Sequence, residues 1–304
     1  MPLAPQRART LATILLVALT AVWGSTFFLI RDLVRTVPPA DFLAVRFTMA
    51  AVLMVVIFWR PLRALSRREV AVSLGLGACY GFAQILQTIG LAHTDASVSG
   101  FVTGTYVVLT PVFTALLLRE RVPASTWYAV TLATAGLALL SLQGFSVGFG
   151  EALTLGAAAL YALHIIGLGR LSIPSRAAGM SVVQMLVIAA VSVGAAVPDG
   201  IVWPQGTGQW GAVIYMATAA GVLALWSQTW AQAHMPATRA AIVMTLEPVF
   251  AAGFAIALGG ESLTLRMLTG GALVLAAMYT VELAGRRPGA DHADHAEPTR
   301  HHEV

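Results

Sequence analysis

The sequence predicts an all-α integral membrane protein, with ten transmembrane helices arranged as two inverted five-helix repeats. Three observations favour this fold class. Of the 304 residues, 58% are hydrophobic and only 11% are charged, which leaves too little polar surface to cover a soluble globule. The apolar residues gather in stretches of about 20, the length a helix needs to cross a bilayer. The second half of the chain also repeats a pattern of the first half.

The ten apolar stretches are bounded by Arg, Pro, Asp or Gly clusters. The first could be mistaken for a signal peptide, but its apolar run is too long and has no convincing cleavage site, so we expect it to be retained. The predicted segments, in order, are 11–30, 42–59, 70–91, 97–118, 124–143, 151–169, 178–197, 210–231, 237–258 and 264–284.

Positive charge alternates between the connecting loops. All eighteen basic residues are Arg, and with the N-terminus inside only Arg31, Arg35 and Arg266 fall in outer loops. Short cytoplasmic loops collect positive charge, so this split predicts ten spans with both termini cytoplasmic. The inner segments receive Arg7, Arg9, Arg60, Arg63, Arg67, Arg68, Arg119, Arg121, Arg170, Arg176, Arg239, Arg286 and Arg287.

The last segment, 286–304, is polar and is predicted to be a disordered cytoplasmic tail. Its four His residues could bind a metal weakly, although a solvated tail is the simpler interpretation. No phosphate loop, metal-binding Cys/His spacing or nucleophile elbow is present, so we expect no cofactor and no metal site. The Arg residues form no basic patch, which disfavours a nucleic-acid partner.

The two halves of the chain share a pattern at one constant offset. Residues 87–122 align with residues 228–263. An odd number of helices in each copy turns the second copy upside down, which predicts one repeat at 1–146 and an inverted one at 147–285. The matched pairs are Gln87 with Gln228, Thr88 with Thr229, His93 with His234, and Glu120 with Glu261.

Five short motifs resemble those of the EamA family in the drug/metabolite transporter superfamily. They are "WGSTFF" (23–28), "VRF" (45–47), "TPVF…RE" (110–120), "EPVF…GES" (247–262) and "GGALVLA" (270–276). The resemblance covers nearly the whole chain up to about residue 285. It implies a ten-helix inner-membrane carrier of small metabolites that has no ATP-binding part. One departure is that Thr110 stands in the first copy where the second has Glu247.

Two prolines lie inside predicted spans and are expected to bend their helices. Pro111 cannot donate to the carbonyl of Val107, and Pro248 cannot donate to that of Met244. In lipid, a freed carbonyl needs a partner or a wet cavity, so paired bends suggest gating joints. The alternative is a static kink.

Glu247 lies about ten residues into its predicted span, about 15 Å from either face, where an ionised carboxylate is costly. It could bind a substrate amine or carry a coupling proton, or it could make a structural hydrogen bond at the kinked turn. Arg46 is the other full charge well inside a span. Snorkelling to the headgroups is its simpler role, whereas the sharper hypothesis is that Arg46 and Glu247 share a cavity and hold a zwitterion.

Polar side chains at helical spacing predict the lining of a substrate cavity. Tyr80, Gln84 and Gln87 form one stripe, and Tyr106 lies in a second with Ser99, Thr103 and Thr110. We expect the Tyr and Gln side chains to face the cavity and the Ser and Thr side chains to pack against other helices, with "GFVTG" (100–104) as a helix contact. Further clusters near mid-span are Trp23 with Ser25 and Thr26, Tyr161 with His164, and Trp226 with Gln228 and Trp230.

His164 could relay protons, although a neutral, hydrogen-bonded core histidine is the simpler interpretation. Taken together, these features predict a secondary transporter of small amphipathic metabolites, such as amino acids, that works by alternating access and exports its substrate. Its partners would be the substrate and the lipid bilayer, with proton coupling left open. The rival classes are a passive channel and an intramembrane enzyme, for which Ser25 and His164 are conceivable partners.

Overall fold

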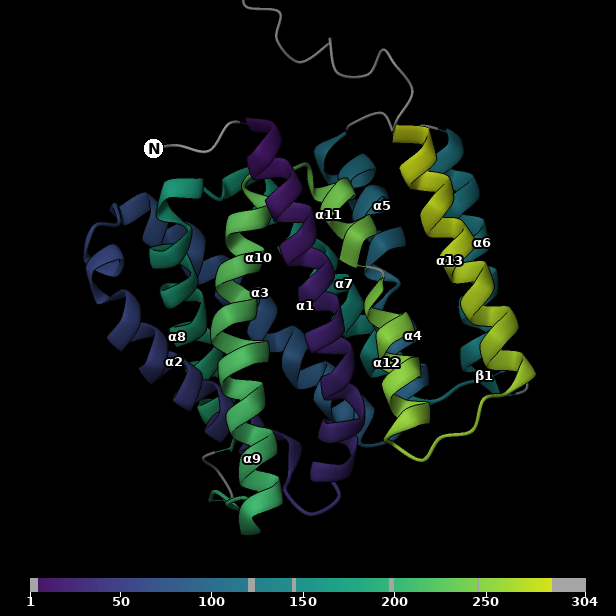
Figure 1. The fold of residues 1–304 in the computed structure, drawn as a ribbon, viewed down its shortest axis with the longest axis horizontal. Helices are drawn as coiled ribbons and strands as arrows, with labels where there is room; N and C mark the ends of the chain where they lie inside the picture. Colours follow the sequence, from purple (N-terminus) through teal and green to yellow (C-terminus); the bar gives the residue numbers. More distant parts are fainter. Residues whose placement is uncertain (1–4, 120–123, 144–145, 197–199, 245, 286–304) are drawn as a thin grey trace, which may run out of the picture.

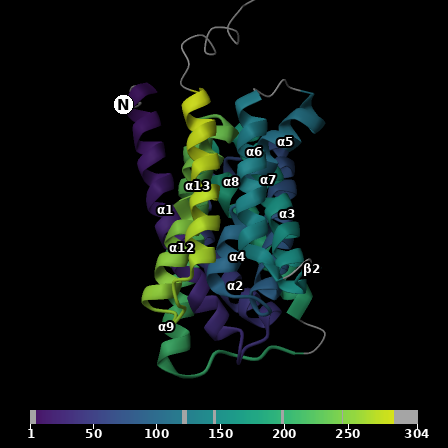
Figure 2. The same ribbon diagram turned by 90° about the vertical axis from the view of Figure 1, so that its right-hand side faces the viewer.

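The chain folds into a bundle of helices whose long axes run in broadly the same direction (Figures 1 and 2). The computed structural model describes residues 5–119, 124–143, 146–196, 200–244 and 246–285. The helices are α1 (Pro5–Leu33), α2 (Pro39–Arg63), α3 (Arg67–Leu91), α4 (Ala96–Thr103), α5 (Tyr106–Leu118), α6 (Ala124–Ser141), α7 (Phe149–Leu171), η1 (Pro174–Arg176), α8 (Ala177–Ala196), α9 (Gly206–Ala217), η3 (Thr218–Leu223), α10 (Ala224–Gln232), α11 (Ala237–Met244), α12 (Leu246–Ala257) and α13 (Leu265–Gly285).

Each of the predicted apolar segments overlaps one helix or a run of consecutive helices. In the described part of the chain, eight such helices or runs are long and apolar enough to cross a membrane. The helix α13 contributes a shorter apolar stretch, 265–277, and α6 is 18 residues long. The predicted tail, 286–304, and Glu120 of the repeat pattern lie outside the described residues.

The strands among the described residues are a pair of two-residue segments, β1 (Leu142–Gln143) and β2 (Ser146–Val147). They pair antiparallel between α6 and α7. Large apolar side chains are exposed along the outer faces of many helices, as expected where lipid replaces water. Examples are Ile14, Val56, Leu116, Tyr128 and Leu268.

Helices from the two halves of the chain pack against each other throughout the bundle. The helix α2 lies against α8, and α6 lies against α13 (Figure 1). The helix α3 packs on both α7 and α8, while α1 packs on α10 and α12. The main buried core therefore lies between the halves and not within either one.

Two of the runs that could span the membrane are interrupted near their middle. The helices α4 and α5 are separated by a turn at Gly104 and Thr105. The run from α9 to α10 passes through η3, a π-helical turn. Irregular backbone at membrane depth is tolerated where it is buried in protein or lines a cavity, so these interruptions mark the interior of the bundle.

Pro248 is the third residue of α12, and residue 245 before this helix lies outside the described residues. In the fourth span, α5 continues through Pro111, and the turn lies at Gly104 and Thr105. Gly104 contacts the other half of the chain. A Cβ atom placed on Gly104 would lie 2.5 Å from Cγ of Pro248, so glycine lets this turn approach α12 closely.

Glycines also allow close contact on either side of α12. A Cβ atom on Gly100 would lie 2.6 Å from Cβ of Ala251, and one on Gly24 of α1 would lie 2.8 Å from the Ala251 nitrogen. The predicted helix contact at residues 100–104 is therefore the contact between α4 and α12. The start of α12, which carries Glu247, is held between α1 and α4.

Candidate functional site

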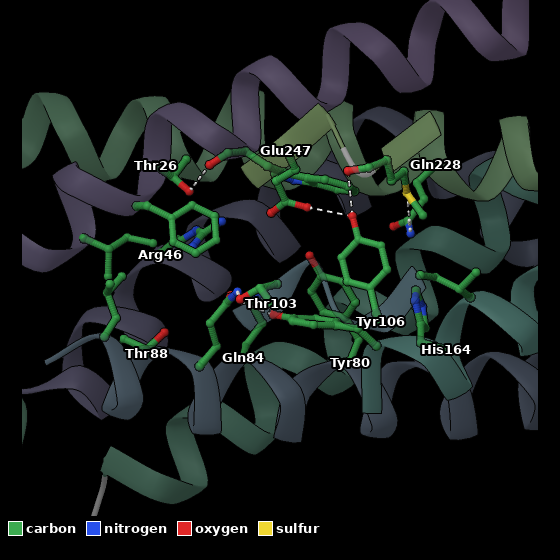
Figure 3. Close-up of a pocket in the computed structure, with 18 residues that line it drawn as sticks. Thr26, Arg46, Tyr80, Gln84, Thr88, Thr103, Tyr106, His164, Gln228 and Glu247 are labelled. Carbon is green, nitrogen blue, oxygen red and sulfur yellow. Dashed lines mark hydrogen bonds between the residues drawn. The ribbon is translucent and has the colours of Figure 1, made fainter. Parts of the chain in front are cut away.

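A buried cavity lies at the centre of the bundle, between the two halves (Figure 3). Its volume is about 50 Å³, which is space for a few water molecules. The walls come from α1, α2, α3, α4, α5, α7, α10, α11 and α12. The lining residues are Trp23, Thr26, Phe27, Ile30, Arg46, Tyr80, Gln84, Gln87, Thr88, Leu91, Thr103, Tyr106, Tyr161, His164, Ile165, Gln228, Met244 and Glu247.

Glu247 lies in the first turn of α12 and is 7% exposed. Its carboxyl group contacts the Tyr106 hydroxyl, with 3.1 Å between Oε2 and the phenol oxygen. The same hydroxyl donates to the carbonyl oxygen of Met244 at 2.7 Å, and Figure 3 draws both contacts. That carbonyl would ordinarily accept from the N–H of residue 248, which is proline, so Tyr106 replaces the missing helical donor.

The Tyr106 hydroxyl has one proton and two neighbours that can accept it. When the proton goes to Met244, the contact with Glu247 is a hydrogen bond only if the carboxyl group is protonated and donates to the phenol oxygen. When Glu247 is ionised, its carboxylate attracts the phenol proton, and the Met244 carbonyl loses its donor. The protonation of Glu247 is therefore chemically linked to the hydrogen bonding of the Met244 carbonyl, four residues before Pro248.

Arg46 does not snorkel, so that sequence interpretation was wrong. Its side chain is 3% exposed and lines the same cavity as Glu247. The guanidinium carbon lies 4.7 Å from the centroid of the Phe47 ring and 5.8 Å from that of Phe42, within cation–π range. The side chain therefore faces the interior of the bundle and not the lipid.

A chain of buried hydrogen bonds connects α3, α7 and α4 on one side of the cavity. The Gln84 amide donates to the Tyr161 hydroxyl, which donates to Oε1 of Gln87 at 2.8 Å. The Gln87 amide then donates to Oγ1 of Thr103 at 3.0 Å. The network fixes the orientation of both amides, because each has a donor and an acceptor end.

His164 lies beside this network and is held by a hydrogen bond. Its Nε2 lies 2.9 Å from Oε1 of Gln184, an oxygen that only accepts, so Nε2 carries the proton. The ring meets Tyr80 edge to face, with 5.0 Å between centroids. This geometry suits the neutral tautomer of a core histidine. Nδ1 has no hydrogen-bond partner among the described residues.

Of the twelve side chains expected to bind substrate, ten line the cavity. Ser25 and Trp226 do not. The Ser25 hydroxyl lies 2.7 Å from that of Tyr215 and also donates to the carbonyl of Val22. Trp226 stacks on Phe58, with 5.9 Å between ring centroids. Both lie on helix faces that meet a neighbouring helix, and a single sequence does not say which face that is.

Trp23 does line the cavity, and it also supports the π-helical turn. Its indole N–H donates to the carbonyl of Ala220 in η3 at 3.2 Å. A π turn displaces one carbonyl from the regular ladder, and here α1 provides the donor for it. Gln228, in the helix that follows, points its Oε1 into the interior without a hydrogen-bond partner among the described residues.

The sequence interpretation missed several lining residues. Thr103 was assigned to packing, but it reaches the cavity and accepts from Gln87, because the turn at Gly104 changes the direction of the fourth span. Thr88 is adjacent in sequence to Gln87 and could have been found from the matched Gln-Thr pairs of the repeat. The remaining members are apolar and carry no signal that separates lining from core: Phe27, Ile30, Leu91, Ile165 and Met244.

A separate charged cluster joins the end of α1 to the start of α4. Arg31 and Glu261 form an ion pair at 2.5 Å, and Arg31 also donates to the carbonyl of Gly259 at 2.7 Å. Glu261 accepts from the backbone N–H groups of Ala96 at 2.9 Å and Ser97 at 3.3 Å. A carboxylate at a helix N-terminus satisfies unpaired N–H groups and the positive end of the helix dipole.

The chain resembles known proteins in sequence and in fold. A model of the EamA-like transporter family matches the chain twice, at residues 10–142 and 148–283. A protein of Archaeoglobus fulgidus named as an uncharacterized transporter is 29% identical over 276 residues, covering 90% of this chain and 87% of its own length. A crystal structure with 20% sequence identity covers 92% of this chain and 98% of its own, with a TM-score of 0.69, and so shares the fold.

Proposed function

Since this chain belongs to the EamA-like transporter family, we propose that it is a secondary transporter that moves small amphipathic metabolites, such as amino acids, by alternating access. The observation that carries the proposal is the central cavity. It is buried, lies between helices of both halves, and contains one cationic and one acidic side chain, Arg46 and Glu247, among its described lining.

The proposed architecture is ten spans in two inverted repeats, 1–146 and 147–285. The double match of one family model supports a duplicated unit. The packing supports it as well, because the contacts are reciprocal: α1 packs on α10 and α12, while the corresponding helix of the second half, α7, packs on α3, α4 and α5. A two-fold relation between inverted halves produces this kind of reciprocal packing.

Alternating access is supported by the size of the cavity and by the interrupted helices. A cavity of about 50 Å³ holds a few water molecules, so an amino acid requires the surrounding helices to move apart. Interrupted spans can hinge near their middle, and two of them border the cavity. We place the movement at Gly104 and at η3.

The proposed coupling site is Glu247. Its link through Tyr106 to the Met244 carbonyl would let loss of a proton loosen the start of α12, and gain of a proton would restore it. Transport would then proceed as export against proton entry. We propose an inner-membrane location with both termini cytoplasmic, and the Arg distribution supports that orientation.

The proposal is tested with purified protein in liposomes. Counterflow, in which unlabelled substrate inside drives uptake of labelled substrate, requires a carrier whose site is exposed to one side at a time. We expect saturable counterflow for at least one compound in a panel of amino acids, nucleosides and cationic dyes. Uptake that rises linearly with concentration and shows no counterflow would identify a passive channel instead. The enzyme alternative receives no support from the contacts of Ser25, which are with Tyr215 and Val22.

A further inference from the structure

The guanidinium group of Arg46 is buried without a charged partner. In the part of the chain that the structure describes, it forms no ion pair and no hydrogen bond, and its Nε is fully enclosed. Its close neighbours are the rings of Phe42 and Phe47. The nearest acidic group in the cavity, Glu247, contacts Tyr106 instead.

A buried guanidinium group normally has its donors satisfied by an anion or by several oxygen atoms. Arg stays charged and presents five N–H donors in a planar fork, and stacking on aromatic rings satisfies none of them. The N–H donors of Arg46 are therefore satisfied only when a further acceptor enters the cavity. A carboxylate matches the fork with two parallel hydrogen bonds, which gives the strongest neutralisation for the space available.

We propose that Arg46 binds a carboxylate of the transported molecule, and that this group defines the substrate class as small monocarboxylates. The assignment rests on the proposed transport function and adds to it the identity of one recognised group. Among the described lining residues, Arg46 is the one cationic side chain and Glu247 the one acidic side chain. A phosphate dianion would leave an uncompensated negative charge beside Glu247, which disfavours phosphorylated compounds.

The rest of the cavity suits a short molecule with an apolar body. Trp23 and Phe27 of α1 lie on one wall, and Tyr80 lies on another. Figure 3 shows Arg46 and Thr26 toward one end of the cavity, with His164 and Gln228 toward the other and Glu247 between them. The unpartnered Oε1 of Gln228 offers an acceptor for a donor group of the same ligand, away from the carboxylate.

The test uses pairs of ligands that differ only in the carboxylate. Purified full-length protein in detergent is titrated with phenylalanine and phenylalaninamide, with leucine and leucinamide, and with phenethylamine, and thermal stabilisation gives each affinity. We expect at least one acid to bind about tenfold or more tightly than its amide, because the amide loses the charge-assisted pair. Equal affinity within every pair, or stabilisation by amides and amines alone, or by none of the probes, would overturn the assignment.

Variants then assign the discrimination to Arg46. Arg46→Gln should bring the acid down to the affinity of its amide, while Arg46→Lys, which keeps the charge but not the fork, should retain part of the preference. Preference for the acid that persists in folded Arg46→Gln would place the carboxylate elsewhere. If that variant fails to fold, the comparison of acid and amide in the wild-type protein still decides the substrate class, and Arg46→Lys decides the residue.

Failure of this inference is distinguishable from failure of the transport function. Saturable counterflow of a compound that has no carboxylate, with no preference for acids, would leave the carrier intact and overturn the role of Arg46. Linear uptake without counterflow would overturn the carrier itself, whatever the binding data show.

Discussion

At the scale of single residues, the hydroxyl of Tyr106 has one proton and two acceptor groups beside it. It is the donor that replaces the N–H missing at Pro248, and it also touches the acid most deeply placed in the cavity. Removing it leaves the Met244 carbonyl without its partner in a buried setting. The cost of such an orphaned group is about 1–3 kcal/mol.

The first prediction concerns Tyr106→Phe, which removes only that oxygen. We expect a lower melting temperature, corresponding to about 1–3 kcal/mol, and a transport rate that depends less on pH. Fluorescence-detected melting and counterflow at two pH values measure these effects. Tyr128→Phe, on an exposed face of α6, is the matched control and should change neither. An unchanged melting temperature in Tyr106→Phe would show that the Met244 carbonyl needs no donor.

Glu247→Gln tests the coupling role directly. Glutamine keeps the size of the side chain and still donates to the Tyr106 oxygen, so it imitates the protonated acid. We expect exchange of substrate to persist and accumulation driven by a pH gradient to disappear. Glu69→Gln, in the first turn of α3, is the control acid outside the cavity. Undiminished gradient-driven transport in Glu247→Gln would remove this acid from the mechanism.

Arg46 shows how far sequence reasoning reaches at this scale. The sequence gives its depth in α2 but not its rotation about the helix axis, and rotation decides between lipid and cavity. Headgroup contact is the cheaper arrangement for an isolated helix, which is why snorkelling was expected. In the fold the Arg46 side chain is buried and faces the cavity beside the rings of Phe42 and Phe47, and this burial depends on helices distant in sequence.

At the scale of helices and turns, the glycines beside α12 control the approach of the two halves. Gly104→Ala would place a methyl group 2.5 Å from Cγ of Pro248, well inside van der Waals contact. We expect a loss of about 1–3 kcal/mol in stability and slower transport, because the Gly104 turn can no longer approach Pro248 as closely. Gly75→Ala, in a helix position with open space around it, should be neutral or slightly stabilising. Melting curves of both variants separate the clash from a general effect of alanine.

The ion pair of Arg31 and Glu261 belongs to the same scale, because it binds two helix ends together. Glu261→Ala removes the acceptor of the Ala96 and Ser97 amides. We expect these amides to exchange with deuterium about tenfold faster, which hydrogen exchange with mass spectrometry measures. Arg35→Ala, whose side chain is 70% exposed, should leave the exchange at α4 unaltered. Equal exchange in Glu261→Ala and wild type would mean that other groups hold this end.

At the scale of the whole molecule, the positions of the helices were predictable from the sequence. Apolar length and loop charge located each segment, because the bilayer imposes the same constraint on every span. What the sequence could not supply was the relation between segments: the Gly104 turn, the contact of Ser25 with Tyr215, and the inclusion of Thr103 in the cavity all depend on a partner from another helix.

The proposed topology has its own test. In a background where the single cysteine, Cys79, is replaced by serine, a cysteine is placed either at Ala64, between α2 and α3, or at Gln205, before α9. A membrane-impermeant maleimide applied to intact cells should label residue 205 and not residue 64, and lysis should expose residue 64. Labelling of both sites, or of residue 64 alone, in intact cells would contradict the arrangement with cytoplasmic termini.

The wide turn at η3 has a geometric result for the helix that follows it. A π turn accommodates one surplus residue, and each residue of an α-helix advances the phase by about 100°. Side chains after residue 223 are therefore rotated by that angle relative to an uninterrupted helix, and Gln228 faces inward in this rotated frame. Without the extra residue of the π turn, the Gln228 amide would face a neighbouring helix. The turn at 218–223 therefore sets which side chains of α10 face the cavity.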